Sequence, residues 1–302
     1  MFKLPIGVDI NNLIDDLRFF SWEASDIMSY HSKNLNNKAY IKKIIKSGND
    51  LDPVTVADLE VNDLIIKSIN KSYEKIDWNI LSEENVKIRS SNFEKKSKWL
   101  WVLDPLDGTK DFIQGTGNYA MHLALNYKKR PHIGIVLIPE KNELWITDGK
   151  KTWCEKKDGS IRQVNLQNYK TLRDMTIVTS KNHRNENLRD LINKIGFKKA
   201  NVMGSIGCKV ASILRGECDI YISLSLPGKS SPRDWDFAAP EAVLRAAGGC
   251  ITNLENEKLS FENPYFKQEG IIIASNNRQN HKNICLEIKQ IIKKHDLFPI
   301  DI

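Results

Sequence analysis

Apolar residues recur every three or four positions in two stretches near the start of the chain. Over residues 10–30 this spacing predicts an amphipathic helix, whose apolar face consists of Leu13, Leu17, Phe20, Ala24, Ile27 and Met28. A second helix begins near Val56 and carries Asp58 in its first turn. Its apolar face consists of Ala57, Val61, Leu64, Ile65 and Ile69. Both helices are therefore expected to cover a core on one side only.

Short apolar runs in the middle of the chain predict strands. Residues 78–82 predict a short strand, and residues 99–103 form an apolar run suited to a buried strand. Residues 122–127, 133–139 and 143–147 look like successive antiparallel strands, with a turn at 128–131. The first half of the chain is therefore expected to contain an antiparallel sheet.

Helices and strands are interleaved after residue 170. The expected order is a strand at 175–179, helices at 185–195 and 208–214, a strand at 218–222 and a helix at 237–247 that ends at Gly248-Gly249. This change predicts an α+β half over residues 1–170 and an α/β half over residues 171–302. Because no Gly- or Ser-rich linker separates the halves, they are expected to share a broad interface, where active sites often lie.

Composition narrows the class of protein. The 302 residues are 41% hydrophobic and 27% charged, which is typical of a globular enzyme. No apolar stretch approaches the roughly 20 residues of a membrane helix, and no secretory segment opens the chain, so a cytoplasmic protein without integral membrane association is expected. The net charge of +7 is spread along the chain without interleaved aromatics, which argues against nucleic acid and leaves anionic small molecules as partners.

The motif Asp104-Pro105-Leu106-Asp107-Gly108-Thr109 follows the strand at 99–103. Its two carboxylates, three positions apart across an expected turn, are hard oxygen donors suited to Mg²⁺, and the Leu106 carbonyl adds another. Gly108 permits close approach to a ligand, and a short helix from Thr109 would direct free N–H groups at a phosphate. The alternative is an Asp-Pro and Asp-Gly turn that binds nothing.

Three further carboxylates stand where a strand ends or a helix begins. Glu83 follows the strand at 78–82, Asp58 lies in a first helical turn, and Asp236 is expected to cap the helix at 237–247. Singly, such residues are ordinary helix-start acids. Together with Asp104 and Asp107 they would hold two or more Mg²⁺ ions against both attacking and leaving oxygens.

These motifs resemble the hallmarks of the inositol monophosphatase superfamily. The W-[IV]-x-D-P-[IL]-D-G-T pattern is present at 101–109, and the later W-D-x-A-x-x-E-A-x-x-x-x-A-G-G pattern at 235–249. The helix start Thr55-Val56-Ala57-Asp58 and the turn Ser82-Glu83-Glu84 match as well. The resemblance implies a layered αβαβα sandwich and a hydrolase that acts on a small-molecule phosphate ester, as a monomer or homodimer.

The resemblance also implies roles for individual residues. It assigns one Mg²⁺ to Glu83, Asp104 and the Leu106 carbonyl, a second to Asp104, Asp107 and Asp236, and two or three ions in all. It implies a nucleophilic water held by Thr109 and Asp58, with Glu83 in the catalytic set. The substrate phosphate would lie against Leu106, Asp107, Gly108, Thr109 and Asp236.

Within the superfamily, several segments are similar to 3′(2′),5′-bisphosphate nucleotidases, which implies a role in sulfur assimilation. They are Lys110-Asp111-Phe112, residues 179–185 and residues 204–209, and analogy places Ser180, His183, Ser205 and Lys209 at the nucleotide. No acid stands between Asp219 and Asp234, which suits a second phosphate better than a polyol. The expected reaction removes the 3′-phosphate of 3′-phosphoadenosine 5′-phosphate; the alternative is an inositol-1-phosphate phosphatase.

Other interpretations stay open at this level. Lys229 and Arg233 precede the second motif either as bases near a phosphate or as part of an exposed loop. The histidines other than His183, His122 among them, are expected to be structural or exposed. A degenerate, non-catalytic phosphate-ester binder is the rival from another class, although every motif acid and Thr109 are present.

Overall fold

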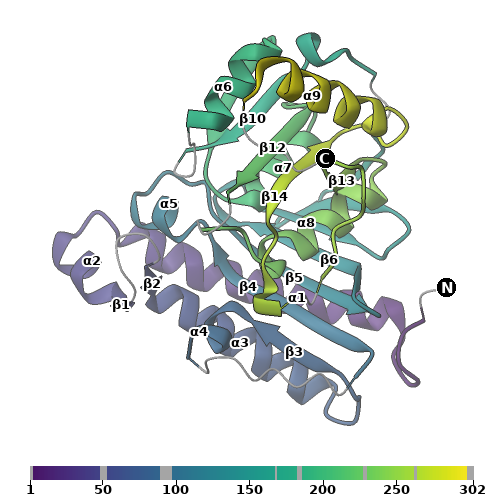
Figure 1. The fold of residues 1–302 in the computed structure, drawn as a ribbon. Helices are drawn as coiled ribbons and strands as arrows, with labels where there is room; N and C mark the ends of the chain where they lie inside the picture. The colour runs from purple at the N-terminus through teal and green to yellow at the C-terminus, as the bar shows by residue number, and fades with distance from the viewer. Residues whose placement is uncertain are drawn as a thin grey trace.

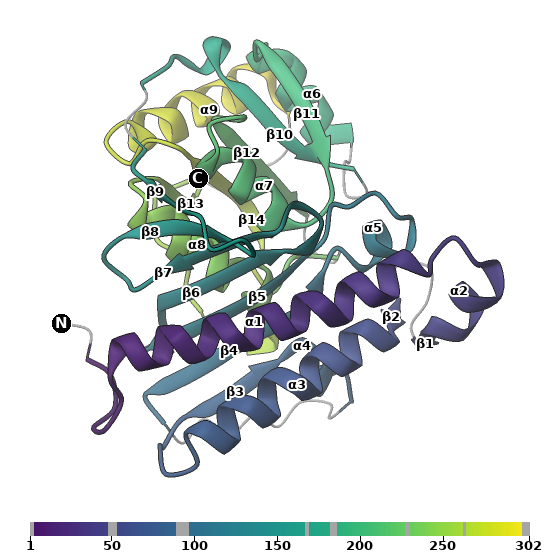
Figure 2. The same cartoon turned by 180° about the vertical axis from the view of Figure 1, so that it is seen from behind.

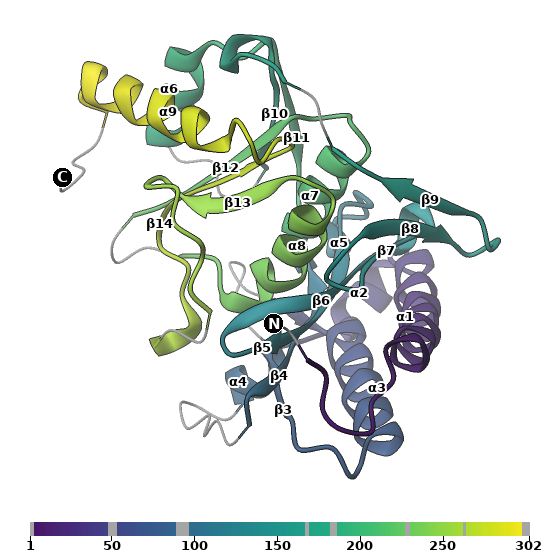
Figure 3. The same cartoon turned by 90° about the vertical axis from the view of Figure 1, so that its right-hand side faces the viewer.

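Two β-sheets alternate with three layers of helices, as Figures 1 and 3 show from the front and the side. The computed structural model describes residues 3–47, 53–88, 97–166, 169–181, 186–226, 230–261 and 264–297. From one side to the other the layers are α1 and α3, a seven-stranded sheet, α7 and α8, a five-stranded sheet, and α6 with α9. The expected αβαβα sandwich is confirmed.

The seven-stranded sheet has the order β3-β4-β5-β6-β7-β8-β9. All its neighbouring strands are antiparallel except β3 and β4, which are parallel. Its strands are β3 Asn79–Ser82, β4 Trp99–Asp107, β5 Ala120–Tyr127, β6 Arg130–Ile138, β7 Glu143–Thr147, β8 Thr152–Lys156 and β9 Ile161–Val164.

The central strands of this sheet are buried on both faces. In β4, Trp101 and Leu103 pack with α1 (Ile10–Lys33) and α3 (Val56–Ser72), whereas Leu100 and Val102 pack with the layer of α7 and α8. Figure 2 shows α1 and α3 side by side across the outer face of the sheet. Two-sided burial explains why β4 is a continuous apolar run rather than an alternating one.

The five-stranded sheet has the order β11-β10-β12-β14-β13 and is mixed, with β11, β10 and β12 parallel and the other pairs antiparallel. Its strands are β10 Thr176–Ser180, β11 Lys199–Met203, β12 Ile220–Ser225, β13 Cys250–Asn253 and β14 Gly270–Ser275. The helices α7 Ile206–Leu214 and α8 Asp234–Ala246 lie between the sheets, and α6 Glu186–Ile195 and α9 His281–His295 cover the outside (Figure 3). No helix of the described part of the chain is long and apolar enough to cross a bilayer.

Short elements complete the chain. They are α2 Lys38–Ile44, β1 Ile45–Ser47, β2 Val54–Thr55, α4 Glu83–Ile88, α5 Thr109–Ile113 and the 3₁₀ turns Pro139–Lys141, Leu172–Asp174 and Pro264–Phe266. The change from one sheet to the other falls between β9 and β10. The division into two halves at residue 170 stays a prediction.

Two expectations about the acidic motifs were wrong in detail. The motif at 104–107 is not a turn that closes β4, because the strand continues through Asp107 and stays paired with β5. Asp236 is not the residue before its helix. Helix α8 begins at Asp234, since the Asp236 carboxylate accepts the Arg233 backbone N–H and so stabilises an earlier start.

Candidate active site

A β-bulge places Asp104 and Asp107 on the same face of β4. Asp104 pairs with His122, and Asp107 pairs with Ala120, so three steps on β4 match two steps on β5. Residues three apart on a regular strand point to opposite faces, but the extra residue in the bulge restores them to one face. Pro105 fits this position because a bulge does not require its missing N–H. Both carboxylates therefore face the layer of α7 and α8.

Asp236 completes an acidic cluster at this face. One carboxylate oxygen from each of Asp104, Asp107 and Asp236 lies within 4.8 Å of the others, with the first two residues buried and the third partly buried. Burial, followed by the nearby carboxylates, raises the pKa of Asp104 and of Asp236 well above the ordinary value. Like charges in a water-poor site are unfavourable, and a divalent cation offsets that cost. The donor set fits Mg²⁺, which prefers carboxylate oxygens.

Glu83 joins the cluster from the start of α4. Its charge is among the causes that raise the pKa of Asp104 and of Asp236. Its Oε1 lies 2.9 Å from Lys87 Nζ, one turn further along the same helix. A metal ion bound to Glu83 would therefore share this carboxylate with the Lys87 ammonium group. The next residue, Glu84, is buried and contributes to the raised pKa of Asp58.

Asp58 has two structural partners and one candidate catalytic partner. It closes a capping box at the start of α3, where its Oδ2 accepts hydrogen bonds from the backbone N–H and the hydroxyl of Thr55. Its Oδ1 lies 3.2 Å from Thr109 Oγ1, which is also 3.1 Å from the Leu106 carbonyl oxygen. Burial, opposed by the Thr55 hydrogen bonds, raises the pKa of Asp58 to about 7. Asp58 and Thr109, 51 residues apart, are thus in contact, as a water-holding pair requires.

Gly108 makes the sharp entry into α5 possible. Its φ of +90° lies in the left-handed region, and an added Cβ would come within 2.8 Å of the Asn118 carbonyl oxygen and 3.2 Å of Ser205 Cβ. The expected short helix from Thr109 is present as α5. Ser205 lies close because its hydroxyl donates to Asp107 Oδ2 at 2.7 Å, which joins the start of α7 to the acidic motif.

The residues expected at the nucleotide are only partly brought together. Ser180 is buried at the end of β10, and Ser205 contacts Asp107. Lys209 is not presented at the surface: it is 3% exposed, its Nζ lies 3.1 Å from the Ser205 carbonyl oxygen and 5.2 Å from the centre of the Tyr221 ring. Its charge acts on Asp236 from inside the protein.

The other basic residues expected near the nucleotide are placed differently or lie outside the described part of the chain. The Arg233 guanidinium donates to the Tyr265 carbonyl, which ties the start of α8 to a neighbouring loop. His183 and Lys229 lie outside the described residues. Lys181 Nζ lies 2.7 Å from Gln114 Oε1 just after α5. The predicted contacts to a second phosphate therefore stay predictions.

His122 is a site residue that the sequence analysis missed. It was grouped with structural or exposed histidines, but its Nε2 lies 3.2 Å from Asp107 Oδ2 and its Nδ1 4.0 Å from Asp104 Oδ2. One signal was present in the sequence: His122 interrupts an otherwise apolar run from Ala120 to Leu125. A histidine buried in such a strand needs polar partners, although the sequence does not say which.

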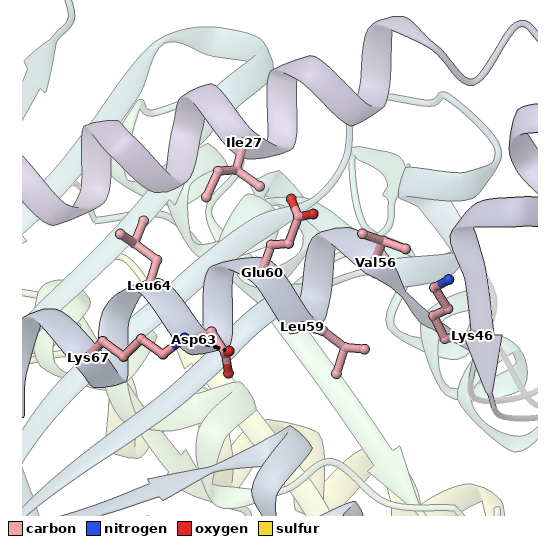
Figure 4. Close-up of a pocket in the computed structure, with 8 residues that line it drawn as sticks. All are labelled: Ile27, Lys46, Val56, Leu59, Glu60, Asp63, Leu64 and Lys67. Carbon is pink, nitrogen blue, oxygen red and sulfur yellow. Dashed lines mark hydrogen bonds and ion pairs between the residues drawn. The ribbon is translucent and has the colours of Figure 1, made fainter.

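A groove elsewhere on the surface is lined by none of the candidate site residues. It has a volume of about 470 Å³ and is lined by side chains of α1, β1 and α3, as Figure 4 shows. Its lining mixes apolar and charged side chains: Ile27, Lys46, Val56, Leu59, Glu60, Asp63, Leu64 and Lys67. Asp58 lies on the opposite, buried face of α3, so the groove is not part of the candidate site.

Comparisons with known proteins identify the family of this chain. The sequence profile of the inositol monophosphatase family matches residues 22–293. A 3′(2′),5′-bisphosphate nucleotidase CysQ of Buchnera aphidicola is 30% identical over 231 residues, which cover 76% of this chain and 81% of the relative. The CysQ of Escherichia coli K12 is 28% identical over 226 residues, 72% of this chain and 85% of the relative.

Solved structures show the same fold at lower identity. A Staphylococcus inositol monophosphatase bound to 2′-AMP has a TM-score of 0.70 and 21% identity, over 95% of this chain and 100% of its own. An inositol monophosphatase of Thermotoga maritima has a TM-score of 0.67 and 21% identity, over 93% and 99%. The chain therefore belongs to the inositol monophosphatase family and is a phosphatase that acts on small phosphate esters.

Proposed function

We propose that this phosphatase is a Mg²⁺-dependent 3′(2′),5′-bisphosphate nucleotidase that removes the 3′-phosphate of 3′-phosphoadenosine 5′-phosphate. The observation that carries the metal dependence is the cluster of Asp104, Asp107 and Asp236 within 4.8 Å, with Glu83 beside it. Glu83, Asp104 and the Leu106 carbonyl would hold one ion, and Asp104, Asp107 and Asp236 a second. When bound, such ions neutralise phosphate charge, polarise a water molecule and stabilise the leaving oxygen.

The protein's own residues position and deprotonate the nucleophile. Thr109 Oγ1 lies between Asp58 Oδ1 and the Leu106 carbonyl oxygen, so it can accept a hydrogen bond from water while its own hydrogen points to Asp58. A pKa of about 7 lets Asp58 accept a proton at neutral pH through Thr109. The water oxygen would then bond to phosphorus as the bond to the ribose 3′-oxygen breaks, without a covalent enzyme intermediate. The leaving oxygen would take up a proton from solvent, and Asp58 would return its own proton to solvent.

The choice of substrate has separate support. The curated relatives reported above are named as bisphosphate nucleotidases, and the acid-free stretch at 220–233 lacks a carboxylate for the ring hydroxyls of a polyol such as inositol. Because Lys209 is buried, its proposed role differs from the direct contact to the nucleotide that the sequence predicts. In this conformation its ammonium supports Asp236 and the start of α7, and a direct contact to the 5′-phosphate would require it to leave the Ser205 carbonyl.

A phosphate-release panel tests the proposal. The purified protein would be given 3′-phosphoadenosine 5′-phosphate, adenosine 3′-monophosphate, inositol 1-phosphate and fructose 1,6-bisphosphate, with and without Mg²⁺. We expect the highest kcat/KM for the adenosine bisphosphate and no turnover after chelation. Faster turnover of inositol 1-phosphate would instead identify an inositol-1-phosphate phosphatase. Binding without release of phosphate from any compound would indicate a non-catalytic protein.

A second measurement assigns Lys209. If Lys209 contacts the 5′-phosphate, Lys209→Ala lowers kcat/KM about 10- to 150-fold for the bisphosphate, since a charge-assisted contact contributes roughly 1.5–3 kcal/mol. Adenosine 3′-monophosphate, which lacks that group, would then be affected little. Equal losses on both substrates would show that Lys209 acts through Asp236 instead. Lys194→Ala, at an exposed lysine on α6 outside the segments assigned to the nucleotide, is the control for loss of one positive charge.

A further inference from the structure

Three groups converge on one oxygen of Asp107. The Ser205 hydroxyl lies 2.7 Å from Oδ2, the Gly207 backbone N–H 3.0 Å and His122 Nε2 3.2 Å. The other oxygen of Asp107, Oδ1, accepts no hydrogen bond from the described residues. A carboxylate held through one oxygen presents its second oxygen in a defined direction, which is what an octahedral Mg²⁺ site demands of its ligands.

His122 reaches this position because of the sheet register. It lies directly opposite Asp104 on β5, and its neighbours on the same face, Ala120 and Ala124, are small. The ring is fully buried, with Nδ1 3.4 Å from the Trp235 carbonyl oxygen on α8. Nε2 has no well-aligned hydrogen-bond partner among the described residues, and the Asp107 carboxylate lies 3.2 Å away. A buried N–H without an acceptor is costly, so Asp107 is the group placed to satisfy it.

Gly207 is matched to this histidine. A Cβ at position 207 would stand 2.2 Å from His122 Nε2, 2.9 Å from Val136 Cγ1 and 3.0 Å from Ala120 Cβ. The first turn of α7 can therefore approach the ring edge only because residue 207 has no side chain. The same glycine donates its N–H to Asp107, so the histidine and the helix start hold the carboxylate from two sides.

We infer that His122 is a positioning residue that orients Asp107 for the metal, and that Gly207 provides the space this requires. The inference rests on the proposed Mg²⁺ site and adds a group to it that does not touch the ion. Both ring nitrogens face acceptor oxygens, Nε2 that of Asp107 and Nδ1 that of the Trp235 carbonyl. The contact that orients Asp107 therefore requires a proton on Nε2.

Paired variants distinguish orientation from packing. His122→Asn keeps a polar group near the position of Nδ1 but cannot reach Asp107, whereas the longer amide of His122→Gln can place a donor at the position of Nε2. We expect the asparagine variant to bind Mg²⁺ about 10- to 100-fold more weakly, as loss of an outer-shell partner typically does. The glutamine variant should bind nearly as tightly as the wild type. Isothermal titration calorimetry with Mg²⁺ alone measures this without substrate.

Controls make each outcome decisive. His281→Asn removes another buried histidine, hydrogen-bonded to Thr252 and Ser275 on the far sheet, and should lower stability without changing Mg²⁺ affinity. Gly207→Ala should weaken Mg²⁺ binding even if His122→Asn does not fold. Wild-type affinity in either folded variant, or equal losses for asparagine and glutamine, would overturn the inference. Failure of the wild type to bind Mg²⁺ would instead overturn the proposed function.

Discussion

Three carboxylates act on the side chain of Asp104. After burial, the charges of Glu83, Asp107 and Asp236 are the causes that raise its pKa, so Asp104 stands at the electrostatic centre of the cluster. Its Oδ1 also lies 3.1 Å from the Leu106 backbone nitrogen inside the bulge. The same residue thus shapes the strand and supplies the ligand that both proposed ions would share.

Replacement of Asp104 by asparagine separates these two contributions. The amide oxygen can still accept the Leu106 N–H, so the fold should persist, but the loss of one negative charge should remove several kcal/mol of transition-state stabilisation. We expect kcat to fall by about 10²- to 10⁴-fold in a Mg²⁺-dependent phosphate-release assay. Asp158→Asn, at an exposed acid, is the control. Retention of a tenth of wild-type activity would contradict the two-metal assignment.

At Thr109 the hydroxyl is the group that matters. Thr109→Ala removes the contact to Asp58 Oδ1, whereas Thr109→Ser keeps it. The alanine variant should lower kcat at least 100-fold with little change in KM, because a positioned proton acceptor contributes about 10²- to 10⁴-fold. The serine variant should retain most of the activity. A raised KM with unchanged kcat in the alanine variant would show that Thr109 binds substrate rather than water.

Two irregularities of the backbone, a β-bulge and a left-handed glycine, orient the residues of the candidate site. The bulge in β4 and the left-handed Gly108 come within four residues of each other, and together they direct Asp104, Asp107 and Thr109 to one point. Regular strand geometry would have placed the two aspartates on opposite faces. The Ser205 contact then joins the start of α7 to this motif, so the candidate site lies between the seven-stranded sheet and the middle helix layer.

Gly108 and Gly115 offer a matched comparison at either end of α5. Both have positive φ, +90° and +65°, but a Cβ at 108 meets the Asn118 carbonyl oxygen at 2.8 Å, whereas a Cβ at 115 meets nothing within 4 Å. Gly115→Ala should cost about 1 kcal/mol of unfolding free energy from backbone strain alone. Gly108→Ala should cost about 2–4 kcal/mol, because a clash with the backbone adds to that strain, and should also lower activity. Urea denaturation of both variants measures the difference, and equal losses would refute the role of close packing at Gly108.

For the whole molecule, the buried carboxylates of the candidate site link the free energy of unfolding to pH and to metal binding. The pKa of Asp58 rises from 3.8 to about 7 on folding, so the native state binds this proton more tightly than the unfolded state does. The resulting stabilisation is complete below pH 3.8 and is lost as pH rises through about 7. The raised pKa values of Asp104 and Asp236 act in the same direction.

Thermal melting without and with Mg²⁺ tests this linkage. In EDTA, the contribution of Asp58 should lower the melting temperature between pH 4 and pH 7, and Asp58→Asn should flatten that slope. Mg²⁺ should raise the melting temperature more at pH 8 than at pH 5, because it binds the deprotonated carboxylates. An equal effect of Mg²⁺ at both values would mean that these carboxylates do not bind it.

The sequence by itself determined the class of fold and the family, and it supplied the candidate acids. Helical periodicity identified α1 and α3, a continuous apolar run identified β4, and the spacing of the motifs at 101–109 and 235–249 pointed to a phosphatase. These signals are local, because each depends on residues a few positions apart along the chain. They placed five carboxylates near the ends of elements without showing how the side chains meet.

Only the tertiary structure decided how the site is assembled. The bulge that turns Asp107 onto the face of Asp104 is a property of pairing with β5, and the same register brings His122 opposite Asp104. The enclosure of Lys209 against Ser205 and Tyr221 depends on how α7 packs between the sheets. Strand register and layer packing join residues tens to more than a hundred positions apart, and a shift of one residue would reverse which face each side chain occupies. The candidate acids could therefore be chosen from the sequence, whereas their placement side by side depends on non-local strand pairing and packing.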